Sequence, residues 1–277
     1  MKEYFFKNKS MYVVGDIHGE FNIIKSIIKQ KNITDSIFLF AGDVGLGFYK
    51  FSYYEEILKK INKFLVTKNV YLLFGRGNHD DKSYFENELI NFSNIKSIPD
   101  YSIIKVNNEW SNGDIITLYI GGGISIDRKY RINSEEIDKF YYKLRHPNAS
   151  DDDINKNVRK LYWIDEPPFF DIDKLDEIVN NFEKINCIAS HTCPSFAYPK
   201  DKLGIQEWMK IDSDLEKDVD EERNTMTNIY NFLKDSGVKL DRWVYGHFHK
   251  HNDEIIDNVR FTLLDCAQNK LDFTEIG

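Results

Sequence analysis

The chain has 277 residues, of which 42% are hydrophobic and 30% are charged. These proportions are typical of a folded globular protein and exclude a disordered or fibrous chain. With 37 Lys and Arg against 45 Asp and Glu, the formal net charge is −8. A broadly basic surface is thereby excluded, and we do not expect extended duplex nucleic acid as a partner.

The sequence contains no targeting or membrane signal that we recognise. No apolar run reaches the roughly 18 to 20 residues that a membrane span needs, and the first residues lack the apolar stretch of a signal peptide. We therefore expect a cytoplasmic protein without a membrane partner. The cysteines Cys187, Cys193 and Cys266 are scattered and form no C-x-x-C pair, so reduced, packed thiols are expected.

Short apolar runs that end abruptly in Gly, Asp, Asn, Ser or His recur along the chain. The runs occupy residues 12–14, 37–40, 70–74, 115–120, 187–189 and 243–245. They are rich in β-branched and aromatic residues and lack polar alternation, which predicts strands buried on both faces.

Helical patterns separate the first three runs. Apolar residues share one face of residues 21–28 and of residues 57–65, and Ser52-x-x-Glu55 matches a capping box. The order β-α-β-α-β predicts a parallel sheet. Two further helices are expected at residues 171–185 and 222–236.

Two polar segments carry five of the six prolines, and we interpret them as loops or lids on one domain that spans residues 1–277. They cover residues 127–170 and 194–221. Neither has enough apolar periodicity for a core of its own. The acidic stretch 212–222 is expected to be a solvated loop, with a lid over the site as the alternative.

The polar strand endings hold the candidate functional residues. Ligands bind outside the carboxyl ends of the strands in an open parallel sheet, so these side chains should converge. The candidate metal ligands are Asp16, His18, Asp43, Asn78, His191, His247 and His249. A single zinc needs about three or four ligands, so this set predicts two metal ions. Its mixture of oxygen and nitrogen donors suits Mn, most of all, or Fe, Zn, Co or Ni.

The same residues form five blocks in a fixed order: Asp16-x-His18, Gly42-Asp43, Gly77-Asn78-His79-Asp80, His191 and Gly246-His247-x-His249. This order resembles the calcineurin-like metallophosphoesterases, in particular their bacterial and phage members. The resemblance implies an α/β fold: a four-layer α/β/β/α sandwich with the metal site at the carboxyl ends of the strands.

The resemblance also implies which residues bind each metal ion and which residue acts on the substrate. One metal would be bound by the residues matching Asp16, His18, Asp43 and His249, and the other by those matching Asp43, Asn78, His191 and His247. His79 would act as general acid or stabilise charge near the leaving group. The expected activity is hydrolysis of a phosphoester by a metal-bridged hydroxide, by a phosphatase or a phosphodiesterase.

The sequence departs from the protein Ser/Thr phosphatases of this superfamily at Leu46 and Gly47, where they have an Asp that orients the catalytic His and an Arg that binds phosphate. We therefore take a protein Ser/Thr phosphatase as the second alternative. The orienting partner of His79 is unidentified, and Arg76 is one candidate for the phosphate-binding arginine.

A looser resemblance to bacterial and phage members covers residues 121–131 and 162–166. The glycine run at 121–123 follows an expected strand, so nearby side chains should line the substrate cleft. On that basis Asp127, Arg128 and Arg131 are candidate substrate-binding residues. The first alternative to an enzyme is a catalytically silent metal-binding scaffold of the same fold, although silent members usually lack a ligand or the His after Asn.

Overall fold

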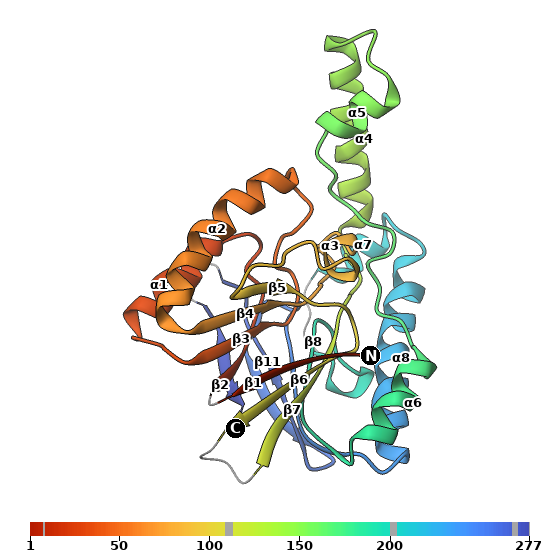
Figure 1. Ribbon diagram of the computed structural model, residues 1–277. Helices are drawn as coiled ribbons and strands as arrows, with labels where there is room; N and C mark the ends of the chain where they lie inside the picture. Colours follow the sequence, from red (N-terminus) through yellow and green to blue (C-terminus); the bar gives the residue numbers. More distant parts are fainter. Residues whose placement is uncertain (8, 109–112, 200–203, 268–270, 277) are drawn as a thin grey trace.

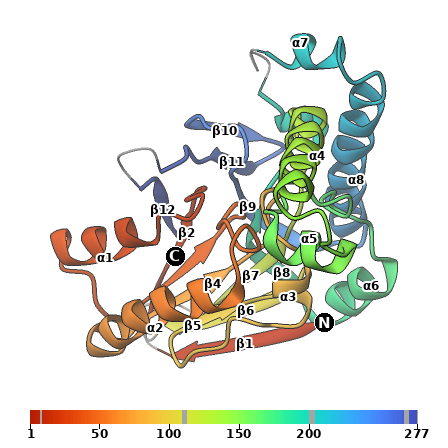
Figure 2. The same ribbon diagram turned by 90° about the horizontal axis from the view of Figure 1, so that it is seen from above.

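The computed structural model describes residues 1–7, 9–108, 113–199, 204–267 and 271–276. Two β-sheets pack face to face, and helices cover both outer faces (Figures 1 and 2). The expected four-layer α/β/β/α arrangement is thus confirmed. Within the described residues no helix is long and apolar enough to cross a membrane.

The five-stranded sheet is built from the predicted β-α-β-α-β opening. Its order is β12-β2-β3-β4-β5, with β2 to β5 parallel and β12 antiparallel to β2. The strands are β2 (Ser10–Val14), β3 (Ser36–Phe40), β4 (Val70–Phe74), β5 (Ile95–Ser97) and β12 (Phe273–Ile276). The covering helices are α1 (Phe21–Gln30) and α2 (Phe51–Lys68), and the short α3 (Ser83–Glu86) follows β4. The proposed capping box is wrong, because α2 begins at Phe51 without a side-chain cap.

The second sheet has seven strands in the order β1-β6-β7-β8-β9-β11-β10. The strands are β1 (Lys2–Lys7), β6 (Ser102–Asn108), β7 (Gly113–Ile120), β8 (Lys184–Ser190), β9 (Lys239–Tyr245), β10 (Asn252–Ile256) and β11 (Val259–Leu263). Strands β7, β8, β9 and β11 run parallel, while β6 and β10 are antiparallel to their neighbours β7 and β11. Helices α6 (Ile172–Asn181) and α8 (Leu215–Asp235) cover the outer face, which confirms the two later helices.

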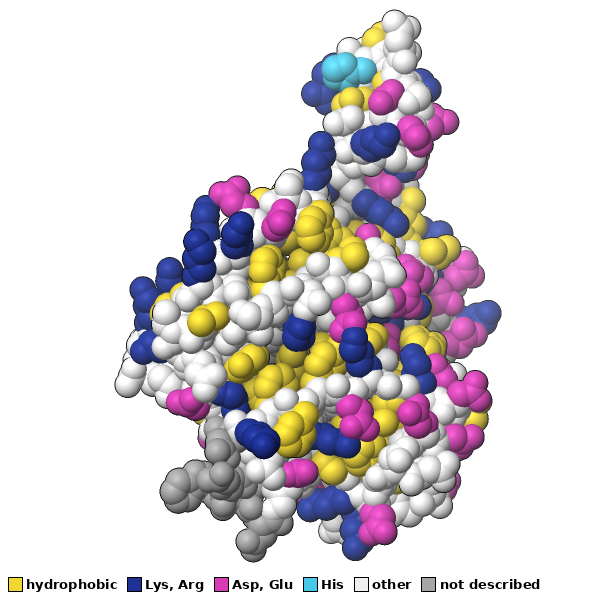
Figure 3. Space-filling model, viewed as in Figure 1, with side chains coloured by type: hydrophobic (Ala, Val, Ile, Leu, Met, Phe, Trp, Pro, Cys, Tyr) yellow, Lys and Arg dark blue, Asp and Glu magenta, His cyan; other side chains and the backbone are white. Residues whose placement is uncertain are grey.

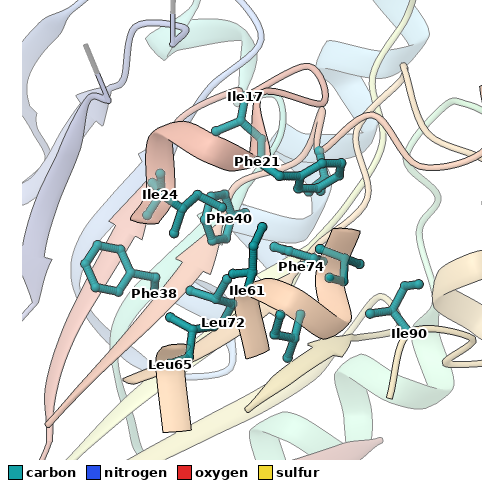
Figure 4. Packing of buried hydrophobic residues seen from close by; sticks show 14 of the residues in the cluster. Ile17, Phe21, Ile24, Phe38, Phe40, Ile61, Leu65, Leu72, Phe74 and Ile90 are labelled. Atoms are coloured by element: carbon teal, nitrogen blue, oxygen red, sulfur yellow. The ribbon is translucent and has the colours of Figure 1, made fainter. Parts of the chain in front are cut away.

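Alternation along the central strands explains the layers. In β3 every residue is buried; Phe38 and Phe40 face α1 and α2 (Figure 4), whereas Ile37 and Leu39 pack between the sheets. Burial of each such side chain contributes roughly 1.5 to 3 kcal/mol. A strand with apolar contacts on both faces needs a continuous apolar run, as the sequence pattern indicated.

Residues 127–170 differ from the expected loops. They form α4 (Arg128–Arg145) and α5 (Asp151–Asn157), which project from the body as a two-helix arm (Figure 1). Helix α4 leaves large apolar side chains such as Ile137, Phe140 and Leu144 exposed. Their spacing by three and four residues is that of an apolar helical stripe, which lies on the arm and not in the main core.

Residues 194–221 also hold more helix than expected. They contain a 3₁₀ turn at Ser195–Ala197, α7 (Ile205–Met209) and the start of α8, while residues 200–203 lie outside the described part. The acidic stretch 212–222 is mostly the opening of α8, where Leu215 and Val219 pack against Ile124. Acidic side chains in a first helical turn are favoured by the helix dipole.

Charge is distributed unevenly over the face shown in Figure 3. Lys and Arg gather over α1 and α2, whereas Asp and Glu gather over α8. Although the net charge of the chain is −8, the surface over α1 and α2 is therefore locally basic.

Candidate metal centre

The seven candidate ligands converge where the carboxyl ends of the two sheets meet. Asp16 and His18 follow β2, Asp43 follows β3 and Asn78 follows β4. From the other sheet, His191 follows β8, and His247 and His249 follow β9. The side chains thus converge as expected from the strand endings, but two sheets contribute them where one parallel sheet was expected.

Three of these residues form an outer cluster, defined as Asp16, His18 and His249. Their ligand atoms lie within 4.8 Å of one another. The Nε2 atoms of His18 and His249 are 3.1 Å apart, and Nε2 of His249 is 3.4 Å from Oδ2 of Asp16. Both imidazoles reach solvent, while the carboxylate is buried, so the outer cluster lies at the mouth of the site.

Three others form an inner cluster, defined as Asn78, His191 and His247. Oδ1 of Asn78 is 2.7 Å from Nε2 of His191 and 2.9 Å from Nδ1 of His247. Nδ1 of His191 lies 2.9 Å from the carbonyl oxygen of Ala41 and donates a hydrogen bond to it, which leaves Nε2 facing Asn78. Nε2 of His191 and Oδ1 of Asn78 are thus neighbouring atoms that could bind one cation together.

Asp43 stands between the clusters. Its Oδ2 is 3.9 Å from Nδ1 of His18, and its Oδ1 is 3.3 Å from Nε2 of His191. One carboxylate oxygen therefore faces each cluster. The carboxylate is fully buried, which would raise its pKa, but the neighbouring imidazoles of His191, His79 and His18 hold that pKa below its usual range.

The backbone is strained at four of the seven candidate ligands. His18, Asp43, His247 and His249 have φ values of 45°, 46°, 69° and 50°. For residues with a Cβ this left-handed conformation costs roughly 1 to 2 kcal/mol each. Such strain concentrates at functional sites, where the surrounding fold maintains it.

Two glycines allow the loops to meet. A Cβ on Gly77 would lie 2.0 Å from Oδ1 of Asp43, and one on Gly42 would lie 2.4 Å from Nδ1 of His191. Both distances are shorter than any real contact, so only glycine fits. The donor set fits two divalent metal ions.

His79 lies beside the clusters, and its side chain contacts an arginine from the arm. Nη2 of Arg131 is 2.9 Å from Nε2 of His79, and Nε of Arg131 is 2.7 Å from Oδ1 of Asp127. Burial, and to a lesser degree the positive charge of Arg131, lowers the pKa of His79 to about 4 against the opposing pull of Asp43. Arg131 thus lies in the position of the orienting partner of His79, which the sequence analysis left unidentified.

A pocket of about 330 Å³ opens over this site. Both clusters contribute to it, as do the sequence-predicted Asp127 and Arg131. Its lining comprises Asp43, Asn78, His79, Ser125, Ile126, Asp127, Arg131, His247, Phe248, His249 and Lys250. Asp127 and Arg131 thus line the pocket, and their role in substrate binding stays a prediction.

The structure contradicts the substrate-binding role expected for Arg76. Its side chain is buried, and all five of its N–H groups have partners: two donate to Asp100, and the others donate to the carbonyl groups of residues 165, 166 and 167. A guanidinium has no further donor, so none remains for a phosphate. Arg76 anchors the loop at 165–167 instead.

The structure also contradicts the cleft position expected for Arg128. This arginine is buried and pairs with Asp212 and with Asp218 at the start of α8. It lines a separate cavity of about 430 Å³, to which α8 contributes Asp218 and Glu222. Its role is to fasten the base of the arm to α8.

Sequence reasoning did not assign a role to Asp80. Its buried carboxylate accepts hydrogen bonds from the backbone N–H groups of Val44, Gly45, Leu46 and Gly77. Burial and the neighbouring charge of Asp43 raise its pKa to about 7. Asp80 thereby ties the loop after β3 to the loop after β4, and its position directly after Asn78-His79 was the available signal.

Solved structures with low sequence identity resemble the chain. A dimetal phosphatase from Danio rerio has 10% identity and a TM-score of 0.45, with 93% of this chain and 87% of that chain covered. The phosphopantetheinyl hydrolase from Mycobacterium tuberculosis has 13% identity and a TM-score of 0.42, with 94% and 90% covered. A putative 5'-nucleotidase from Staphylococcus aureus has 12% identity and a TM-score of 0.42, with 98% of this chain but only 51% of that chain covered.

The comparison with curated proteins finds no match. Residues 10–251 match the family model described as calcineurin-like phosphoesterase. That range contains every candidate ligand and most of both sheets. The chain therefore belongs to the calcineurin-like phosphoesterase family.

Proposed function

We propose that the protein is a phosphoester hydrolase that uses two divalent transition-metal ions, one at each cluster. The observation that carries this proposal is the placement of Asp43, whose two carboxylate oxygens face different clusters. Asp16, His18 and His249 would complete the first site, and Asn78, His191 and His247 the second. When bound, such an ion pair supplies a nucleophile near neutral pH and stabilises charge on the transferring group. The mixed donors favour Mn²⁺ over Mg²⁺.

His79 and Arg131 act on the substrate side of this proposal. Nη2 of Arg131 lies within hydrogen-bond distance of both ring nitrogens of His79, 2.9 Å from Nε2 and 3.3 Å from Nδ1, and so holds the imidazole in place. We assign to His79 the hydrogen bond to the leaving oxygen, a contribution of typically about 10²-fold or more in rate. Asp127 holds the guanidinium in position through Nε.

The pocket supports a small substrate or a substrate with a narrow end. Its volume of about 330 Å³ lies at the low end of the range for small-molecule sites. Arg131 contributes a cation to the lining, which suits an anionic phosphoester. Extended duplex nucleic acid would need a long basic surface, and the net charge of −8 argues against it.

The proposal is tested by turnover of 4-nitrophenyl phosphate and of bis(4-nitrophenyl) phosphate. We expect Mn²⁺ to support hydrolysis of at least one of them, EDTA to abolish it, and Mg²⁺ to restore it less well. The ratio of the two rates separates a monoesterase from a diesterase. Two bound ions without turnover of any phosphoester would favour the silent scaffold, and preference for a phosphoserine peptide would favour the Ser/Thr phosphatase alternative.

A further inference from the structure

Two buried residues stand directly behind Asn78. Nδ2 of Asn78 donates to Oγ of Ser125 over 2.8 Å, and Oγ of Ser125 donates to Oε2 of Glu166 over 2.6 Å. The backbone N–H of Ser125 also donates to Oε1 of Glu166, at 2.8 Å. The exposed fractions of Asn78, Ser125 and Glu166 are only 3%, 2% and 1%.

The direction of these hydrogen bonds determines which way the amide of Asn78 faces. Burial raises the pKa of Glu166 to about 8. In its ionised form the carboxylate accepts the one proton of the Ser125 hydroxyl, so Oγ of Ser125 presents lone pairs to the NH₂ group of Asn78. The carbonyl oxygen of the amide then points the other way, toward His191 and His247, from which it is 2.7 Å and 2.9 Å distant.

We propose that Ser125 and Glu166 are positioning residues that hold Asn78 with its oxygen directed into the inner cluster. This inference rests on the proposed function, because it is the inner metal ion that would use the oxygen. With the amide reversed, an NH₂ group would face that ion and one ligand would be lost. Groups that orient ligands in this manner typically contribute about 10- to 100-fold in metal affinity.

A second buried carboxylate braces the same loop from α8. Glu222 accepts the backbone N–H of Ile124 through Oε2 and, over 2.7 Å, the hydroxyl of Thr192 through Oε1. Thr192 follows His191, so the loop that carries Ser125 is joined to another inner ligand. Burial of a carboxylate is costly, and hydrogen bonds from Ser125 to Glu166 and from Ile124 and Thr192 to Glu222 offset part of that cost.

The positioning role also explains why the chain has the two short motifs at residues 121–131 and 162–166: each supplies one of the two residues behind Asn78. The first supplies Ser125 and the second supplies Glu166, and the backbone N–H of Gly123 donates to the carbonyl oxygen of Glu166 over 3.0 Å. The two segments are distant in sequence but form one support for Asn78. The presence of Ser125 and Glu166 in the two motifs is therefore explained without a contact to the substrate.

The test is a calorimetric titration of the metal-free protein with Mn²⁺. We expect two bound ions in the wild type, and in Ser125→Ala about 10- to 100-fold weaker binding of one ion with the other unchanged. Ser102→Ala is the matched control, because Ser102 is equally buried and its hydroxyl donates to the carbonyl oxygen of Pro99, on the β5–β6 connection. It should leave both affinities unchanged.

Glu166→Gln keeps the size of the side chain and tests the same support should Ser125→Ala fold poorly. It should weaken the same ion, and the double variant should be no worse than Ser125→Ala, because both residues act through one amide. Two normal affinities in Ser125→Ala and Glu166→Gln would overturn the positioning role alone. A wild type that binds no Mn²⁺ would overturn the proposed function, and the positioning role with it.

Discussion

Gly77 lies so close to Asp43 that the two residues can be in place together only because Gly77 lacks a side chain. An added Cβ would lie 2.0 Å from Oδ1 and 2.3 Å from the backbone nitrogen of Asp43. This contact joins the loop after β4, which carries Asn78, to the loop after β3. The distance between the two proposed metal positions therefore depends on a glycine that binds neither ion.

We predict that Gly77→Ala lowers the free energy of unfolding by about 1 to 3 kcal/mol, the usual cost of overpacking, and abolishes tight Mn²⁺ binding. Denaturant unfolding and a Mn²⁺ titration measure the two effects. Gly237→Ala is the control: Gly237 has a φ of +84° but no atom near its Cβ position, so the change strains only the backbone. Two tightly bound ions in Gly77→Ala would refute the importance of the close approach.

A second prediction concerns the partner of His79. Arg131→Met removes the guanidinium that lies 2.9 Å from Nε2 of His79, and with it a cation of the pocket. We expect kcat/KM for 4-nitrophenyl phosphate to fall by about 10- to 100-fold, within the range for groups that assist proton transfer. Mn²⁺ binding should be unchanged, because Arg131 contacts none of the proposed ligands in the described contacts.

Arg76→Met should behave in the opposite manner, which tests the structural role that we assign to Arg76. Removal of one partner of the buried pair with Asp100 should destabilise the fold by roughly 3 to 5 kcal/mol. The KM of the molecules that remain folded should be unchanged. A raised KM with unchanged stability would instead indicate that Arg76 binds the substrate.

Removal of metal should be visible as a loss of stability. At a free Mn²⁺ concentration about 100 times the Kd, each bound ion stabilises the folded state by about 2.7 kcal/mol. For a chain of this size the midpoint of thermal unfolding should then fall by roughly 5 to 10 °C per ion after chelation. Equal melting temperatures with Mn²⁺ and with EDTA would argue against ions held by buried ligands.

The strand endings were predictable because the central strands are buried on both faces. Their continuous apolar runs can be recognised in the sequence without knowledge of the structure. The carboxyl ends of parallel strands lie at the same edge of a sheet. That reasoning brought Asp16, Asn78 and His191 together although they are distant in sequence. It reached only the parallel part of the sheets; the sandwich came from the family resemblance.

The arm and the interior of the site were less predictable. Ile137, Phe140, Tyr141 and Leu144 of α4 follow helical spacing, so the apolar stripe was present in the sequence but was not used, and the structure leaves it exposed on the arm. Arg76 was misplaced because its position before Gly77 does not show which way the side chain points. Ser125 and Glu166 are 41 residues apart in the sequence, and no local pattern predicts the hydrogen bond between them.

The bridging role of Asp43 is the central claim, and Asp43→Asn tests it most directly. We predict that this variant, saturated with Mn²⁺ as far as its affinity allows, loses at least about 10²-fold in kcat on 4-nitrophenyl phosphate or its diester. Binding of both ions should weaken, whereas His146→Asn, an exposed change on the arm, should alter neither property. Near-normal turnover by Asp43→Asn with two bound ions would contradict the account.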